Sequence, residues 1–186
     1  MPSPTAMNAI APRTGRRAAT ALGFTLMELL VVVVIVGILS AAAMPSMRSL
    51  VLGQRIKTAV ADVHASIVYA RSEAIKRAKM VAMCASTDGT ACATVNPADW
   101  SQGWIVFVVV DPAAGVVPAS AADILKKQDA LSGVALTGTA TNLSYTRDGR
   151  LAAALTADFK ASNPGVPTAR CVRVSPSGQP NTKVGC

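Results

Sequence analysis

A single carboxylate, Glu28, lies within an otherwise uncharged apolar stretch that runs from Phe24 to Met44. A charged side chain inside an apolar helix is costly unless a cation meets it. In such a helix, Glu28 is therefore expected to need a cation beside it. In the alternative interpretation, Glu28 lies in the first helical turn, reaches the lipid headgroups and is favoured by the helix dipole.

Four cysteines, Cys84, Cys92, Cys171 and Cys186, form a second group of reactive side chains. Because the N-terminus is typical of an exported chain, they predict an oxidising compartment and two disulfides. Three pairings are possible, and the most economical joins neighbours in sequence, Cys84 with Cys92 and Cys171 with Cys186. The cysteines form no paired C-x-x-C units and the chain has one histidine, so we expect no metal site.

Residues that could support catalysis are few. The chain has no nucleophile elbow, no glycine-rich phosphate loop ahead of a helix and no H-E-x-x-H motif. Its only histidine, His64, has no evident cysteine or serine partner. We therefore expect no catalytic residues, no cofactor and no enzymatic activity.

The composition indicates one globular domain with an accessory segment. The chain has 186 residues, of which 51% are hydrophobic and only 4% aromatic, so its core must be largely aliphatic. The formal charge of +8 comes from 18 basic and 10 acidic residues. This mild excess is compatible with binding a polyanion, but it does not by itself identify a nucleic-acid-binding protein.

The N-terminal region predicts a leader, residues 1–23, followed by a membrane-spanning or filament-core helix, residues 24–45. The leader contains three arginines and no acidic residue. The first twenty-one residues of the helix span about 31 Å, which matches a hydrocarbon core of roughly 30 Å. Positive charge ahead of the helix keeps that end in the cytoplasm. We therefore expect a single-pass protein of the bacterial inner membrane whose remaining residues are periplasmic.

An ordinary secretory signal peptide is the alternative for this region. An arginine-bearing start, the apolar run 29–39 and the three alanines 41–43 describe a signal that is cut after Ala43. The product would be a soluble secreted protein. Two features argue against this alternative: Glu28 lies between the arginines and the apolar run, and the helical pattern continues past Ala43.

Residues 46–80 predict an amphipathic continuation of the helix. Pro45 should kink the helix rather than stop it, because helical periodicity resumes afterwards. The apolar residues recur at steps of three and four and form a stripe along one face. The stripe consists of Ile56, Val60, Val63, Ile67, Ala70 and Ala74.

Residues 81–186 predict a β-rich periplasmic domain. Short strand-like runs are separated by turn residues, and no helices alternate with them. We expect an α+β fold in which the long N-terminal helix packs on a mainly antiparallel sheet. The predicted strands are 80–85, 104–110, 124–128, 134–137, 143–145 and 171–174, with an irregular loop at 112–122.

The segment 23–30, Gly-Phe-Thr-Leu-Met-Glu-Leu-Leu, resembles the class III signal of type IV pilins and type II secretion pseudopilins. The resemblance implies that the prepilin peptidase cleaves between Gly23 and Phe24 and that the new amino group of Phe24 is methylated. It also implies that Glu28 pairs with the terminal amine of a neighbouring subunit during assembly. The expected partners are the peptidase, the inner membrane before assembly, and other pilins or pseudopilins in a filament.

Further motifs resemble the GspH/FimT family of minor pilins and pseudopilins, and this resemblance covers most of the chain from Phe24 onward. It implies the pilin fold and a subunit that takes part in assembling a type IV pilus or a type II secretion pseudopilus. The residues themselves also have a structural interpretation, because Ala70 and Ala74 let the helix approach the sheet. The motifs are 70–77, the strand through Cys84, Trp100 with 103–107, Gly149 with Arg150, and 171–175.

A DNA-binding minor pilin for natural transformation is the alternative function. FimT-like pilins carry a basic G-R-x-R-type motif between C-terminal strands, and here residues 178–183 read Gly-Gln-Pro-Asn-Thr-Lys. Glutamine stands where the first arginine would be. The cations that remain in the predicted C-terminal loop are Arg170, Arg173 and Lys183, which form a site only if they share one face. Such a site would bind DNA weakly, without sequence preference and with a strong dependence on salt.

Overall fold

The computed structural model describes residues 23–96, 98–153 and 156–186, without the side chains of residues 42–46. The chain divides into two compact units, Met1–Ala42 and Ala43–Cys186. Of the predicted leader, only Gly23 belongs to the described residues.

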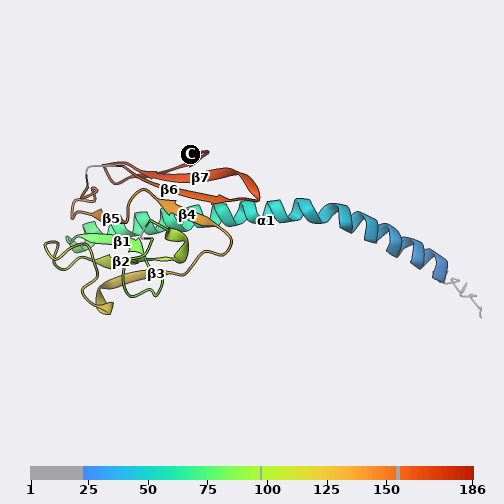
Figure 1. The fold of residues 1–186 in the computed structure, drawn as a ribbon, viewed down its shortest axis with the longest axis horizontal. Helices are drawn as coiled ribbons and strands as arrows, with labels where there is room; N and C mark the ends of the chain where they lie inside the picture. Colours follow the sequence, from blue (N-terminus) through green and yellow to red (C-terminus); the bar gives the residue numbers. More distant parts are fainter. Residues whose placement is uncertain (1–22, 97, 154–155) are drawn as a thin grey trace, which may run out of the picture. The chain divides into compact units, whose positions relative to one another are not determined.

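One long helix, α1 (Leu26–Arg77), contributes residues to both units (Figure 1). Thr25 begins it, because the Thr25 carbonyl and hydroxyl oxygens both accept the backbone N–H of Glu28, at 3.1 and 3.2 Å. The helical hydrogen-bonding pattern continues through Pro45, so the prediction that the helix does not stop there is confirmed. The helix ends where Ala78 adopts a left-handed φ of 52° and the N–H of Lys79 bonds to the carbonyl of Ala74.

In the first unit, the described helical side chains are exposed along the whole of residues 26–41. Its large apolar side chains between Leu26 and Leu39 are 45% to 83% exposed. Among the described residues, no helix is both long enough and apolar enough to cross a membrane. The structure does not describe the side chains of residues 42–45, which form the end of the predicted segment 24–45.

In the second unit, eight strands among the described residues form two antiparallel sheets (Figure 1). Sheet A has the order β3–β2–β1–β5 and sheet B the order β4–β6–β7–β8. The α+β prediction is confirmed, with the strands divided between two sheets. The strands of sheet A are β1 (Val81–Ala85), β2 (Trp104–Val108), β3 (Ile124–Gln128) and β5 (Asn142–Tyr145). Those of sheet B are β4 (Ala135–Gly138), β6 (Ala157–Asn163), β7 (Val166–Val174) and β8 (Pro180–Val184).

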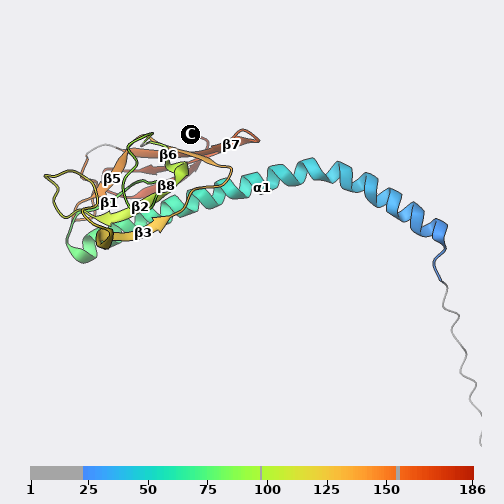
Figure 2. The same cartoon turned by 60° about the horizontal axis from the view of Figure 1, so that its bottom comes forward.

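The apolar stripe of α1 forms the centre of the core between the two sheets. Val63, Ile67 and Ala70 are fully buried there, and Figure 2 shows the C-terminal part of α1 running alongside both sheets. Trp100 meets Phe159 of β6 edge to face, with ring centroids 4.9 Å apart. The predicted stripe is therefore the surface on which the two sheets pack.

The opposite face of sheet A carries a second apolar cluster, so β1 and β2 are buried on both faces. Phe107 belongs to this cluster, whereas Trp104 points into the main core. Val116 of the predicted loop 112–122 packs against the second cluster. Residues 112–120 are irregular, as expected, whereas Ala121–Asp123 form a short 3-10 helix, η2.

Sequence reasoning missed β6 and β8, and within residues 170–183 it predicted only the strand 171–174. The prediction of a loop from Arg170 to Lys183 is wrong, because β7 and β8 form a hairpin around the turn at Ser175–Gln179. The alternative interpretation, that these charged residues lie on a closing pair of strands, agrees with this hairpin. β8 begins with proline and asparagine, which strand propensity disfavours. Small alanines alternate with polar residues in β6, and this gives a weak apolar signal.

Candidate functional site

Gly23, Phe24 and Thr25 lie immediately ahead of α1 in non-helical backbone. Phe24 is 80% exposed. Glu28 lies in the first turn of the helix, and its side chain is exposed. Among the described residues, no ion pair involves Glu28. The residues predicted for cleavage, methylation and assembly thus lie together around the start of one helix.

The helix that follows Glu28 is apolar on all sides. A helix that is hydrophobic all round is normally covered by lipid or by other protein. Leu29, Leu30 and Ile35 lie on different faces of the helix, and each is more than half exposed. The first unit therefore presents an apolar surface that its own described residues do not cover.

Both predicted disulfides are present, Cys84–Cys92 and Cys171–Cys186, with Cα atoms 5.5 and 5.8 Å apart. The first joins β1 to the following loop. Asp88 orders this loop by accepting the backbone N–H groups of Thr90 and Ala91, at 2.8 and 3.1 Å. Hydrogen bonds, first of all from the Thr90 hydroxyl, lower the pKa of Asp88 well below its usual range.

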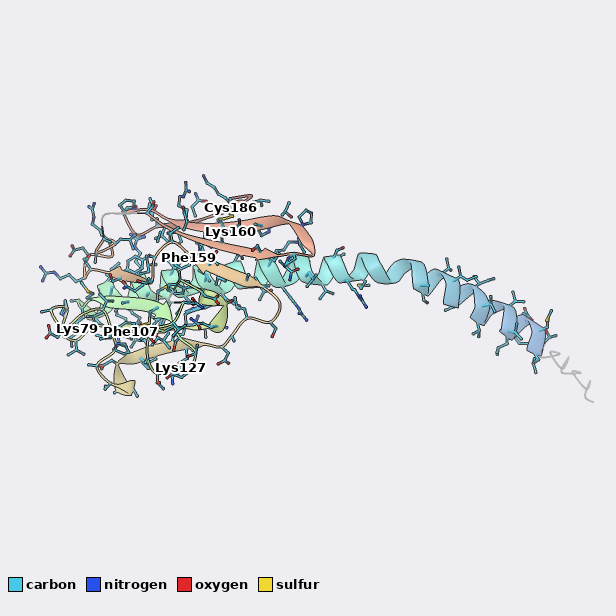
Figure 3. All side chains as sticks on the ribbon, in the orientation of Figure 1. Lys79, Phe107, Lys127, Phe159, Lys160 and Cys186 are labelled. Carbon is cyan, nitrogen blue, oxygen red and sulfur yellow. A yellow bond between two sulfur atoms is a disulfide. The ribbon has the colours of Figure 1, made fainter. Side chains whose placement is uncertain are left out.

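The second disulfide lies on the outer face of sheet B, the face turned away from the core. Strand register places Lys160, Cys171 and Lys183 in one row across β6, β7 and β8. Arg173 lies on the same face, two residues beyond Cys171. Figure 3 shows Lys160 and Cys186 on this side of the sheet, whereas Phe159 is fully buried in the core.

Arg173 is not a free cation. Its Nε and Nη2 donate to the two carboxylate oxygens of Asp158 on β6, at 2.7 and 2.9 Å. This hydrogen-bonded pairing lowers the pKa of Asp158 and raises the pKa of Arg173. The pair lines a groove of about 500 Å³, which we call the outer groove. Its other lining residues are Thr137, Gly138, Thr139, Lys160, Cys171, Lys183, Gly185 and Cys186.

Arg170 lies on the opposite face of β7. It is three residues from Arg173, and in a strand an odd spacing places side chains on opposite faces. It lines a separate groove with residues of α1, including Lys57 and His64. The structure thus brings Arg173 and Lys183 together and separates Arg170 from them, so the three predicted DNA-binding residues do not share one face.

Sequence reasoning missed Lys160 and Asp158, which complete the charged set of the outer groove. Both come from β6, the strand that was not predicted. The alternation from Ala157 to Ala161, with Phe159 at its centre, is the signal that could have revealed this strand.

Two glycines allow close packing: Gly149, which belongs to the proposed family motifs, and Gly178, which begins the stretch 178–183. Gly149 has a φ of +73°, and a Cβ there would lie 2.6 Å from Cδ1 of Ile75 in α1. Gly178 has a φ of +81°, and a Cβ there would lie 2.7 Å from the ring of Tyr145. The buried Tyr145 hydroxyl donates to the Gly178 carbonyl at 3.1 Å, which ties the β7–β8 turn to sheet A. Both glycines therefore have packing roles.

The described residues offer no set of three or more histidine, cysteine, aspartate or glutamate side chains that could hold a metal ion. Some charged groups of the second unit instead form pairs. Arg77, for example, donates to Glu73 four residues earlier in α1, and this hydrogen bond lowers the pKa of Glu73. These charged side chains are therefore suited to binding other charged groups and to stabilising the packed domain.

Comparison with known proteins gives two family matches and one shared fold. The family described as Type II transport protein GspH matches residues 59–178, and the prokaryotic N-terminal methylation motif matches residues 20–44. No curated protein sequence matches the chain.

Two crystal structures of the type IV minor pilin FimU from Pseudomonas aeruginosa, in space groups P21 and P65, are similar in fold, with TM-scores of 0.52 and 0.53. They are 20% and 22% identical in sequence. The matches cover 70% and 68% of this chain and 89% and 91% of the FimU chains.

Proposed function

The chain belongs to the GspH family, and we propose that it is a minor pilin or pseudopilin, a structural subunit of a type IV pilus or a type II secretion pseudopilus. The observation that carries this proposal is the N-terminal methylation motif at the start of an exposed apolar helix. A subunit of this kind is assembled through its helix, and we propose no catalytic role for it.

Processing comes first in the proposed mechanism. The prepilin peptidase cuts between Gly23 and Phe24, and the amine of Phe24 is then methylated. Both residues precede α1 in non-helical backbone, which leaves the bond accessible to a protease. Before assembly, the apolar helix that begins at Leu26 anchors the protein in the inner membrane, with the β-rich unit in the periplasm.

Glu28 then provides the register signal for assembly. In an apolar surrounding its carboxylate is costly until a cation reaches it, and the methylated amine of Phe24 from a neighbouring subunit is such a cation. Because Glu28 has no ion-pair partner among the described residues, it is available for this contact.

The test is incorporation of Glu28→Ala into filaments in cells that lack the wild-type protein. We expect cleavage to remain largely intact and incorporation to be lost. Met27→Ala is the matched control, because it truncates a neighbouring exposed side chain without removing a charge. Normal incorporation of Glu28→Ala would contradict the proposed role of this carboxylate.

DNA binding is a second candidate function, favoured by the three cations and single acid of the outer groove. Among the described residues Lys160 and Lys183 make no salt bridge, although the charge of Lys183 helps to lower the pKa of Asp158. Arg173 is hydrogen-bonded to Asp158. We expect weak, sequence-independent binding. It would become effective when many copies along a filament bind the same DNA molecule.

A labelled duplex titrated at several salt concentrations tests this candidate. Lys160→Ala with Lys183→Ala should weaken binding and reduce the salt slope by about 1.8, because each phosphate contact contributes about 0.9. Arg170→Ala, on the other face of β7, is the control. An unchanged affinity and slope in the double variant would exclude a DNA site in the outer groove.

A further inference from the structure

A second basic groove lies between α1 and the β7–β8 hairpin, on the core side of that hairpin. It has a volume of about 290 Å³, and we call it the helix-side groove. Neither the assembly role nor the proposed DNA site uses it. Its lining residues are Lys57, Val60, Ala61 and His64 of α1, Arg170 of β7 and Thr182 of β8.

The periodicities of helix and strand bring its polar side chains together. Lys57, Ala61 and His64 are spaced by four and three residues and therefore share one face of α1. Ala61 lies between the two longer side chains, and its small size leaves the helix surface open there. On the hairpin, Thr182 pairs with Val172 and therefore lies on the same face as Arg170.

The groove contains three basic residues and no acidic residue. Among the described residues, the side chains of Lys57, His64 and Arg170 make no ion pair. Other arginines of the second unit do, since Arg77 pairs with Glu73 and Arg173 with Asp158. The helix-side groove is thus a concave site with unbalanced positive charge.

We propose that the helix-side groove binds a dianionic tetrahedral oxyanion, a phosphate monoester or inorganic sulfate, together with a proton on His64. Arg170 supplies planar, paired N–H donors that match two oxygens of such a group. Lys57 adds a point charge, and the Thr182 hydroxyl adds a neutral donor.

His64 makes binding depend on pH. Histidine is the side chain whose charge ordinarily changes between about pH 5 and pH 8, and both ring nitrogens are donors when it is protonated. The charged groups that face it from the lining elements are Lys57 on its own helix and Arg170 on β7; β8 contributes only the uncharged Thr182. An anion relieves the repulsion between the three cations, so low pH should favour binding.

Sulfate is the first probe, because its charge stays constant over this pH range. The full chain in detergent micelles is titrated with sulfate against chloride at matched ionic strength, and the imidazole signal of His64 is followed by NMR. The chain has one histidine, so no other imidazole signal overlaps with that of His64. We expect sulfate to shift this signal at about pH 5.5 and to bind about tenfold more weakly at about pH 8. Equal responses to sulfate and chloride would overturn the proposal.

Variants distinguish this groove from general surface charge. Arg170→Gln and Lys57→Gln should each weaken sulfate binding about tenfold. Lys183→Gln, on the opposite face of the hairpin, is the matched control and should leave it unchanged. His64→Gln should retain the weak binding seen at about pH 8 and lose the pH dependence. A Lys183→Gln effect as large as that of Arg170→Gln would contradict the site.

The chemical form of the ligand is tested with two small phosphates. Glycerol phosphate is a monoester that carries two negative charges at neutral pH, and dimethyl phosphate is a diester that carries one. We expect the monoester to compete with sulfate at lower concentration than the diester. Equal competition by the diester would overturn the assignment of a dianionic ligand, and the assembly role would be unaffected by either result.

Discussion

The two halves of α1 differ in how their apolar side chains are covered. In residues 26–41 the apolar side chains surround the helix and are exposed among the described residues. In residues 56–74 they form a stripe that the two sheets bury. The rest of its own chain thus covers the second half, whereas none of the described residues covers the first half. Under the proposed function, lipid or other subunits cover that first half. In the proposed function, one helix therefore both carries the domain and connects it to an assembly.

The largest expected effect comes from opening the core around the second half. Trp100→Ala should destabilise the second unit by about 3–5 kcal/mol, because it leaves a cavity beside Phe159 and removes a hydrogen bond to the Ala140 carbonyl. Chemical denaturation followed by circular dichroism measures this.

Leu30→Ala, in the first half of α1, is the contrasting variant. It should leave the unfolding of the second unit unchanged, because the Leu30 side chain is half exposed. A comparable loss of stability in both variants would break the distinction between the halves.

The disulfides should have the next largest effects on the domain that covers the second half. Replacing both Cys171 and Cys186 by serine should cost about 3 kcal/mol, and replacing both Cys84 and Cys92 about 2.5 kcal/mol, because the first pair closes the longer loop. Peptide mapping without reductant should recover these two linked pairs. Recovery of a crossed pair such as Cys84 with Cys171 would contradict the register of both sheets.

Tyr145→Phe should have a smaller effect, about 1 kcal/mol of unfolding free energy. The substitution keeps the buried ring and removes only the hydroxyl that donates to Gly178. Tyr69→Phe is the control, because Tyr69 is only partly buried at the edge of the same core. Equal stability of Tyr145→Phe and the wild type would show that this contact does not tie the hairpin to sheet A.

The smallest expected effect concerns the Asp158–Arg173 pair on the outer face. The hydrogen-bonded arginine lowers the pKa of Asp158, so the pair contributes stability above about pH 4, and this is lost as the pH falls through the folded-state pKa. Asp158→Asn should therefore lower the melting temperature slightly at pH 7, with the difference shrinking below about pH 4. Arg173→Gln should behave in the same way. A difference that stays constant with pH would rule out this linkage.

Local patterns predicted the parts of the molecule that depend on local spacing. The segment from Gly23 to Glu28 is continuous in sequence, and the stripe from Ile56 to Ala74 follows the helical period. The pairing of Cys84 with Cys92 also needed only a short loop. These predictions required no knowledge of which strands meet.

The charged surfaces could not be predicted in this way, because they depend on strand register. Lys160 meets Cys171 only through the pairing of β6 with β7, and β6 gave a weak signal. The predicted strand began after Arg170, so the alternation that separates Arg170 from Arg173 was not applied. The helix-side groove further requires that α1 place His64 beside the β7–β8 hairpin, and this brings together distant parts of the sequence.

The mature N-terminus tests the central claim most directly. Intact mass spectrometry of the protein extracted from membranes measures where the chain begins and whether its amine is modified. A subunit assembled through the first half of α1 is predicted to begin at Phe24 and to carry one methyl group on that residue. A mature chain that begins at Met44 would show that the apolar helix is removed as an ordinary signal peptide, and this would contradict the account.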